Sequence, residues 1–279
     1  MRGTLYCLPN LIADDTLNGA IAPLVRERAC AIRYFLAEAA KTTRAYLKLL
    51  GHPGPIAELT ITEIGHDPEP ACVDAWLAPV LAGQDAAVVS ESGCPGIADP
   101  GAQIVARAQD LGIRVVPLVG PSSILMTLMA SGLDGQRFRF LGYLPIDQEE
   151  RQQSLKALEA DSRRSETQLF IETPYRNQQM LTSLLDTLSP STRVTVATDI
   201  TGTRESIRTM TVQAWKALPE EARQLPKLPT VFAFLAAPSG EAPRYAPSAS
   251  HHKGHGASAS RRQPPRRSTR TGRPSRSSR

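Results

Sequence analysis

The loop Ser90-Glu91-Ser92-Gly93-Cys94-Pro95-Gly96-Ile97-Ala98-Asp99-Pro100-Gly101 is the most informative stretch of this sequence. It follows an apolar run, residues 86–89, that predicts a buried strand, and it precedes a helical pattern over residues 102–111. Glycine has no Cβ and tolerates positive φ, so this backbone can approach a ligand closely. In an open α/β sheet such a loop lies at the carboxyl end of its strand, where small molecules bind. Considered alone, the loop is also typical of an ordinary strand-to-helix connection.

Strand-like and helix-like segments alternate around this loop, from residue 4 to residue 131. Their short connections predict a mostly parallel sheet covered by helices on both faces. The expected strands are 4–8, 31–36, 58–64, 86–89 and 113–118, and the expected helices are 16–28, 41–50, 71–81, 102–111 and 122–131.

The pattern changes near residues 133–137, and the later strands alternate as in a more antiparallel sheet. We therefore predict an α/β fold with two α/β domains, residues 1–120 and 121–238, the second with a mixed sheet. A cofactor cleft is expected between them. The later strands are expected at 138–144, 168–172, 193–199, 206–212 and 230–236, with helices at 149–161 and 178–188.

The segment 239–279 consists mainly of Ser, Pro, Arg, Gly and His. It has no large aliphatic residues with which to offset the entropy of ordering, so we predict a disordered basic tail. Residues 241–279 carry a charge of +9 and the preceding residues carry −4, although the whole chain is at +5. Eight arginines between Arg261 and Arg279 predict either contacts with RNA phosphates or a solubilising extension.

The remaining composition limits the compartment and the chemistry. No apolar run reaches the length of a membrane span, and no two of the four cysteines form a CxxC pair, which predicts reduced thiols in a cytoplasmic protein. No GxGxxG follows the first strand, and no GxxxxGK[ST] occurs. Before residue 239 the only histidines are His52 and His66, which is poor material for a metal site or for activating Cys94 as a nucleophile. We expect no metal.

Three loops remain as candidates, each after a predicted strand. They are residues 90–101, the turn Val119-Gly120-Pro121-Ser122-Ser123, and the segment Ile171-Glu172-Thr173-Pro174-Tyr175-Arg176-Asn177. Ser122 is a natural helix N-cap, so the second loop is equally consistent with a capped turn. Arg176 is equally consistent with a solvated charge at the start of a helix, and Tyr175 with a half-buried packing residue.

Together the three loops resemble the tetrapyrrole-methylase superfamily of S-adenosylmethionine-dependent methyltransferases. The similarity is greatest to the branch that methylates ribose 2′-hydroxyls of small-subunit ribosomal RNA. That branch has a Ser-Asp-Ala-Gly-Thr-Pro loop ending in Ser-Asp-Pro-Gly, which residues 90–101 resemble. Its Phe-Gly-Phe-Leu-Pro and Tyr-Glu-Ser-Pro-His-Arg elements are similar to residues 140–145 and 170–176.

The resemblance implies that S-adenosylmethionine is the cofactor, that ribosomal RNA or the small ribosomal subunit is the partner, and that the protein is a homodimer. A ribose hydroxyl is a weak nucleophile, so a carboxylate or a lysine near the cleft should help to remove its proton. We expect Glu38 or Glu172 in this catalytic role, and both are equally consistent with orienting neighbouring backbone or pairing with Arg44 and Arg176. We expect Arg44 and Arg176 to bind the substrate. The expected cofactor-binding residues are Ser90, Glu91, Ser92, Gly93, Cys94, Pro95, Gly120, Pro121, Ser122, Thr173, Pro174 and Tyr175.

The sequence departs from the branch at first-domain loops. Leu8-Pro9-Asn10-Leu11 lacks the glycine of Thr-Pro-Ile-Gly-Asn-Leu, the element at residues 37–44 has lost an acidic residue, and Glu91 replaces an aspartate. Two other functions therefore stay open. One is methylation of a small tetrapyrrole-like or other cyclic acceptor, and the other is RNA binding by a catalytically inactive protein of the same fold.

Overall fold

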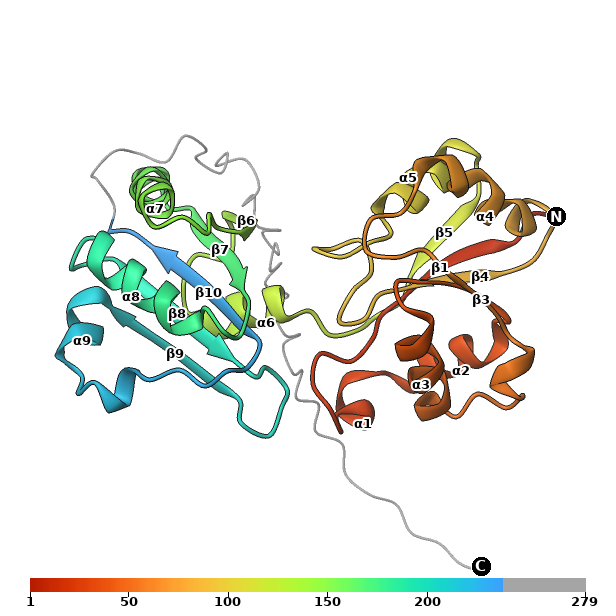
Figure 1. Ribbon diagram of the computed structural model, residues 1–279, viewed down its shortest axis with the longest axis horizontal. Helices are drawn as coiled ribbons and strands as arrows, with labels where there is room; N and C mark the ends of the chain where they lie inside the picture. The colour runs from red at the N-terminus through yellow and green to blue at the C-terminus, as the bar shows by residue number, and fades with distance from the viewer. Residues whose placement is uncertain (238–279) are drawn as a thin grey trace, which may run out of the picture. The chain divides into compact units, whose positions relative to one another are not determined.

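The first sheet is parallel throughout and has the strand order β3-β2-β4-β1-β5 (Figure 1). The computed structural model describes residues 1–237, so the predicted tail at 239–279 lies outside the described residues. Strand β4 is buried along its whole length, as its unbroken apolar run predicts for a parallel sheet covered on both faces. The strands are β1 (Thr4–Leu8), β2 (Tyr34–Ala37), β3 (Thr60–Glu63), β4 (Ala86–Val89) and β5 (Arg114–Pro117).

The helices between these strands follow the predicted alternation, with one difference. The helix expected at 16–28 is two helices, because Pro23 cannot continue a preceding helix and instead begins a new one. Strand β2 starts at Tyr34 because the second of these helices continues to Ala31. The helices are α1 (Leu17–Ala20), α2 (Pro23–Ala31), α3 (Ala40–Leu50), α4 (Val73–Leu81) and α5 (Ala102–Asp110), with short 3₁₀ turns at Ile56–Glu58 and Pro70–Cys72.

The strand order creates a switch point between β1 and β4. From β1 the chain crosses over β4 to reach β2, whereas from β4 it crosses over β1 to reach β5. The loops that follow β1 and β4 therefore leave the sheet in opposite directions, which opens a crevice at their carboxyl ends. The glycine-rich loop 90–101 lies at this point.

The second sheet is mixed, as predicted, with the order β6-β7-β10-β8-β9. Strands β6 and β7 are parallel, and the other neighbours are antiparallel. The strands are β6 (Phe138–Tyr143), β7 (Thr167–Glu172), β8 (Arg193–Thr198), β9 (Ser206–Thr211) and β10 (Thr230–Leu235).

Helices cover the two faces of the second sheet unequally. Leu169 and Ala233 pack against α6 (Ser123–Ser131), whereas the neighbouring Phe170 and Phe232 point to the other face, as strand alternation requires. That other face carries α7 (Gln148–Ser162), α8 (Asn177–Thr187) and the short α9 (Val212–Ala217). Helices α7 and α8 are expected from the sequence, whereas α9 is not. A 3₁₀ turn follows at Glu221–Arg223.

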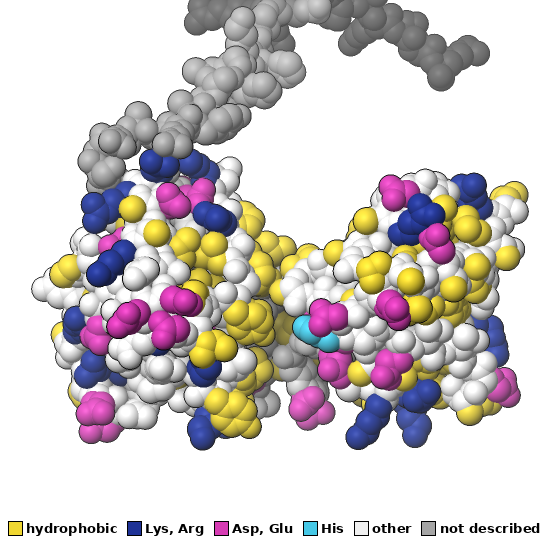
Figure 2. Space-filling model, turned by 45° about the horizontal axis from the view of Figure 1, so that its top comes forward, with side chains coloured by type: hydrophobic (Ala, Val, Ile, Leu, Met, Phe, Trp, Pro, Cys, Tyr) yellow, Lys and Arg dark blue, Asp and Glu magenta, His cyan; other side chains and the backbone are white. Residues whose placement is uncertain are grey.

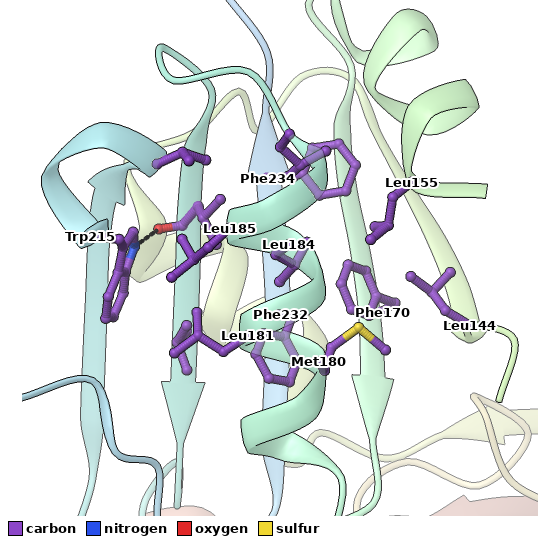
Figure 3. Packing of buried hydrophobic residues seen from close by; sticks show 14 residues of the cluster. Leu144, Leu155, Phe170, Met180, Leu181, Leu184, Leu185, Trp215, Phe232 and Phe234 are labelled. Atoms are coloured by element: carbon purple, nitrogen blue, oxygen red, sulfur yellow. Dashed lines mark hydrogen bonds between the residues drawn. The ribbon is translucent and has the colours of Figure 1, made fainter. Parts of the chain in front are cut away.

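Aromatic side chains fill the core beneath α8 (Figure 3). The rings of Phe170 and Phe232 stack at 5.5 Å between centroids, and Phe234 meets Phe170 edge-on. The indole Nε1 of buried Trp215 donates a hydrogen bond to the carbonyl of Val194 at 3.0 Å. This core holds β7, β8 and β10 in register, and thereby places the ends of β7 and β8 and the start of β10.

Residues 118–122 connect the two sheets, close to the predicted domain boundary, and all of residues 1–237 belong to one compact unit. None of the helices within residues 1–237 is both long enough and apolar enough to cross a bilayer.

A pair of phenylalanine substitutions tests this account of the second core. Phe232 is fully buried on central β10, whereas Phe138 is 43% exposed on edge strand β6. We expect Phe232→Ala to lower the free energy of unfolding by about 3–5 kcal/mol, because it leaves a cavity beside Phe170. Phe138→Ala should cost at most about 1 kcal/mol. Urea unfolding of both variants measures the difference, and equal losses would contradict the assignment of the core.

Candidate functional site

A hollow of about 330 Å³ lies where the loop after β4, the start of α6 and the ends of β7, β8 and β10 come together. Its size falls within the range of small-molecule sites, and it combines an apolar wall with a few polar groups, as such sites commonly do. It is lined by Ile12, Ser92, Gly93, Cys94, Ile97, Ala98, Asp99, Ser122, Ser123, Ile124, Tyr143, Ile171, Glu172, Thr173, Pro174, Ala197, Ile200, Pro229, Thr230 and Val231.

Asn10, in the loop after β1, holds the loop after β4 in place. Its backbone N–H donates to the carbonyl of Gly93 at 2.8 Å, and its side-chain Nδ2 donates to the carbonyls of Ser90 and Glu91, both at 3.0 Å. The side-chain Oδ1 accepts from the N–H of Leu11, so the buried amide is fully used. The start of the glycine-rich loop is therefore fixed by backbone contacts.

The loop after β5 packs against the same two loops. A Cβ at Gly120 would overlap the ring of Pro9, so only glycine allows this approach. The Cys94 thiol donates to the carbonyl of Pro121, and burial raises the pKa of this thiol, which keeps it protonated. Gly93 has φ +64°, and a Cβ at this position would lie 3.4 Å from Cγ2 of Ile12. Three strand ends thus meet with almost no side chain between their backbones.

Asp99 lies in the lining, on a strained part of the loop. The preceding residue, Ala98, has φ +61°, a conformation that side chains other than glycine rarely adopt and that is found disproportionately at functional sites. Burial and the carboxylates of Glu38 and Glu91 raise the pKa of Asp99 to about 6, although nearby His66 opposes the shift. Asp99 can therefore change its protonation state near neutral pH.

Glu38 sits directly after β2 and joins two of these groups. Its Oε2 accepts from the backbone N–H of Glu91 at 2.9 Å, and its Oε1 lies 3.3 Å from Nδ1 of His66. The hydrogen bond to Glu38 and the charge of Asp67 raise the pKa of His66. Figure 2 shows a histidine on this face with acidic side chains gathered around it. This edge of the hollow is therefore acidic.

Glu172 ends β7 on the opposite wall. Its Oε1 accepts from the N–H of Thr173 at 2.7 Å, and its Oε2 lies 3.0 Å from Nη2 of Arg176. Tyr143 reaches the hollow next to the β-bulge of β6, where Gly142 has φ +68°. Burial and the negative charges of Glu172 and Asp99 raise the pKa of Tyr143, so its hydroxyl stays protonated.

The wall beyond β8 is also strained. Asp199 and Thr201 both have positive φ, +52° and +68°, on either side of Ile200, which lines the hollow. The carboxylate of Asp199 accepts from the N–H of Arg204 and leaves no room for a Cβ at Gly202. This tight turn fixes the position of Ile200.

The predicted site residues divide into three groups. Those that line the hollow are Ser92, Gly93, Cys94, Ser122, Thr173, Pro174 and Glu172. Those that lie in the supporting loops, outside the lining, are Glu38, Ser90, Glu91, Pro95, Gly120, Pro121, Tyr175 and Arg176. Arg44 is exposed on α3, away from the lining.

Four important residues are absent from the predicted set: Asn10, Asp99, Tyr143 and Ile200. Asp99 lies in the glycine-rich loop 90–101, but the positive φ of the preceding Ala98 cannot be predicted from the sequence. Asn10 appears in the sequence analysis only within a family motif that has lost its glycine. No sequence pattern marks Tyr143 or Ile200 as site residues. Within residues 1–237, no group of three His, Cys, Asp or Glu side chains is placed to hold a metal ion.

Comparisons with known proteins identify the family and its fold. Residues 24–215 match the family model described as Tetrapyrrole (Corrin/Porphyrin) Methylases. The chain is 34% identical over 206 residues to the ribosomal RNA small subunit methyltransferase I of Escherichia coli O157:H7, covering 74% of this chain and 68% of that protein. It is 31% identical over 209 residues to the protein of the same name from Pseudomonas aeruginosa, covering 75% and 70%.

Two solved structures share the fold. Uroporphyrin-III-C-methyltransferase from Thermus thermophilus has a TM-score of 0.50 and 17% identity, covering 84% of this chain and 93% of that chain. The methyltransferase CobJ has a TM-score of 0.52 and 16% identity, covering 84% and 95%. At this identity the likeness concerns the fold alone.

Gly120→Ala tests the close packing of the loops. Its Cβ would overlap Pro9 and separate the loops after β1 and β5, so we expect a loss of about 1–3 kcal/mol in the free energy of unfolding. The Cys94 thiol should lose its partner Pro121 and react faster with a maleimide, as mapped by mass spectrometry. Gly135→Ala is the matched control, because nothing lies within 4 Å of the Cβ that it adds. Indistinguishable behaviour of the two variants would refute the packing argument.

Proposed function

We propose a function for this chain from the premise that it belongs to the tetrapyrrole (corrin/porphyrin) methylase family. The chain is therefore a methyltransferase. We infer that it methylates a ribose 2′-hydroxyl of small-subunit ribosomal RNA. The observation that carries this inference is the 34% identity, over most of the folded chain, to a protein named ribosomal RNA small subunit methyltransferase I.

S-adenosylmethionine is the methyl donor in this proposal, and the hollow suits it chemically. The apolar side chains Ile12, Ile97 and Ile200 offer a surface for an adenine ring, and Ser92 and Thr173 offer partners for ribose hydroxyls. The carboxyl groups of Asp99 and Glu172 complement positive charge. The residues that would hold the cofactor are Ser92, Gly93, Cys94, Ser122, Thr173 and Pro174. When bound, it supplies a methyl group on a sulfonium that departs as a neutral thioether.

Asp99 is the proton acceptor in this proposal, in place of the expected Glu38 or Glu172. Both glutamates already accept backbone hydrogen bonds that shape the site, Glu38 from Glu91 and Glu172 from Thr173. Asp99 has no such hydrogen bond among the described residues, lines the hollow, and has a pKa near 6 that suits a general base near neutral pH.

The other contributions of the protein are to align the acceptor hydroxyl and to exclude water from the hollow. The hydroxyl proton of the acceptor would pass to the Asp99 carboxylate as the acceptor oxygen takes the methyl group that the bound cofactor would supply. Tyr143, protonated and lining the same hollow as Asp99 and Glu172, can donate a hydrogen bond to the acceptor oxygen and orient it. The apolar wall excludes water, so that the aligned acceptor competes favourably with solvent.

The two alternative functions have less support. A tetrapyrrole acceptor is suggested by the name of the family model and by structures of 14–17% identity, which concern the fold, whereas the relatives at 30–40% identity carry the ribosomal RNA name. The inactive alternative is not favoured, because these relatives are named methyltransferases. A ribosomal substrate also supports a cytoplasmic site of action.

A homodimer completes the proposal. Apolar side chains stand exposed on and beside α6, namely Val119 at 77%, Leu125 at 49% and Met129 at 83%. Such exposed apolar residues on neighbouring turns are typical of association surfaces.

Methyl transfer is the direct test of the function. Small ribosomal subunits from a strain that lacks the modification, incubated with the protein and methyl-labelled S-adenosylmethionine, should gain label in the RNA, and mass mapping should place it on a ribose. Calorimetry should detect binding of S-adenosylmethionine to the protein alone. Absence of binding would overturn the cofactor assignment, and label in a small acceptor but not in RNA would support the tetrapyrrole alternative.

Asp99→Asn tests the proton acceptor. We expect wild-type kcat/KM to increase as pH rises through about 6, where Asp99 loses its proton, and then to level off. The variant should lose that dependence, and its rate should fall by about 10²- to 10⁴-fold. Asp110→Asn, which removes an exposed carboxylate at the end of α5, is the control and should behave as wild type.

The same variant has a stability readout. The folded-state pKa of Asp99 lies above its unfolded value near 3.8, so ionisation of Asp99 destabilises the fold once pH exceeds about 4 and does so fully above about 6. Asp99→Asn should therefore raise Tm at pH 8, and the gain should vanish below pH 4. An unchanged pH–rate profile together with no gain in Tm would refute the assignment.

A further inference from the structure

Tyr175 stands at the rim of the hollow with its ring open to solvent. It follows Thr173 and Pro174, which line the hollow, yet Tyr175 lies outside the lining and is 82% exposed. A large aromatic side chain so exposed buries little apolar surface in its own fold. Its position beside a binding site therefore calls for a ligand that covers it.

The turn that carries Tyr175 is held rigidly. The N–H of Arg176 donates to the carbonyl of Thr173 at 2.9 Å, and Pro174 fixes the turn between them. The N–H of Thr173 is in turn held by Glu172. The ring is therefore presented on a preorganised backbone, which lowers the entropic cost of binding to it.

A second segment brings a cation to the ring. Nζ of Lys227 lies 5.6 Å from the centroid of Tyr175, in a cation–π arrangement. Buried Asn177 ties the two segments together, because its Nδ2 donates to the carbonyl of Leu228 and to Oγ1 of Thr230, at 2.8 and 2.9 Å. Pro229 and Thr230 then continue into the lining of the hollow.

We propose that Tyr175 and Lys227 form a stacking platform for an unpaired nucleobase of the acceptor strand, next to the nucleotide whose ribose enters the hollow. This inference rests on the proposed ribosomal RNA substrate. Aromatic rings bind unstacked bases of single strands, and a lysine beside the ring can reach the adjoining phosphate. The carboxylates of Glu38, Glu91 and Asp99 disfavour phosphates at the loops after β2 and β4, so the strand enters over Lys227.

The platform assigns Tyr175 to the acceptor, although an adenine ring of the cofactor has the same stacking chemistry. The experiment distinguishes a base of the acceptor strand from the adenine of the cofactor by measuring the binding of two ligands to the full-length protein. The first is S-adenosylmethionine, measured by calorimetry. The second is a short single-stranded oligouridylate with one central 2-aminopurine, whose fluorescence is quenched on stacking. The second is measured at raised salt, which suppresses binding that depends on phosphates alone.

We expect Tyr175→Ala to weaken oligonucleotide binding by about tenfold and to abolish the quenching. Tyr175→Phe keeps the ring and should keep both. Lys227→Gln should weaken binding by about threefold. Affinity for S-adenosylmethionine should stay the same in all three. Because Tyr175 and Lys227 are exposed, Tm should not change, which separates loss of binding from loss of fold.

Two results would overturn the platform. One is weakened binding of S-adenosylmethionine by Tyr175→Ala with the oligonucleotide signal intact, which would place the cofactor's adenine on the ring. The other is quenching that survives in Tyr175→Ala. The oligonucleotide measurement needs no methyl transfer, so a wild-type protein that stacks the base but fails to label small subunits would refute the proposed function and leave the platform standing.

Discussion

Close backbone packing between the ends of β1, β4 and β5 is the constraint on which the site depends. The side-chain amide of Asn10 donates hydrogen bonds to two carbonyls of the glycine-rich loop. The ring of Pro9 occupies the space that a Cβ at Gly120 would need. With these contacts made, Cys94 can reach the carbonyl of Pro121. The loops then have little freedom, and the first wall of the hollow is formed before any ligand arrives.

The carboxyl groups on the two sides of the hollow have different electrostatic environments. On one side, Glu38, Glu91 and Asp99 lie close enough to raise the pKa of Asp99. On the other side, Glu172 lies beside Arg176 and is occupied by the backbone of its own turn. The pKa of Asp99 is therefore raised toward neutral pH, while the carboxylates of Glu38 and Glu172 accept hydrogen bonds from the backbone. Such separation of carboxyl roles by environment is how one protein site can combine acid, base and structural functions.

Much of the fold could be predicted from the sequence because its local signals agree with its tertiary structure. The buried run at β4 and the alternating strands β8 to β10 match their expected positions closely. The split between α1 and α2 departs from the single helix that the apolar spacing predicts, because Pro23 lies within that spacing and begins a new helix. In the site, glycines and prolines identified the loops, but not which side chains face the hollow. Tyr143 reaches it through a bulge at Gly142, and Ile200 through two residues with positive φ, and neither conformation can be read from composition.

The short connection between the sheets has a consequence for cooperativity. Residues 118–122 are the covalent link, and Ser122 at its end both caps α6 and lines the hollow. A ligand in the hollow touches residues from both sheets, so its binding free energy is lost when either sheet unfolds. Occupancy therefore couples two hydrophobic cores that are otherwise separate. The ligand acts as a thermodynamic cross-link, because its binding free energy favours only the state in which both sheets are folded.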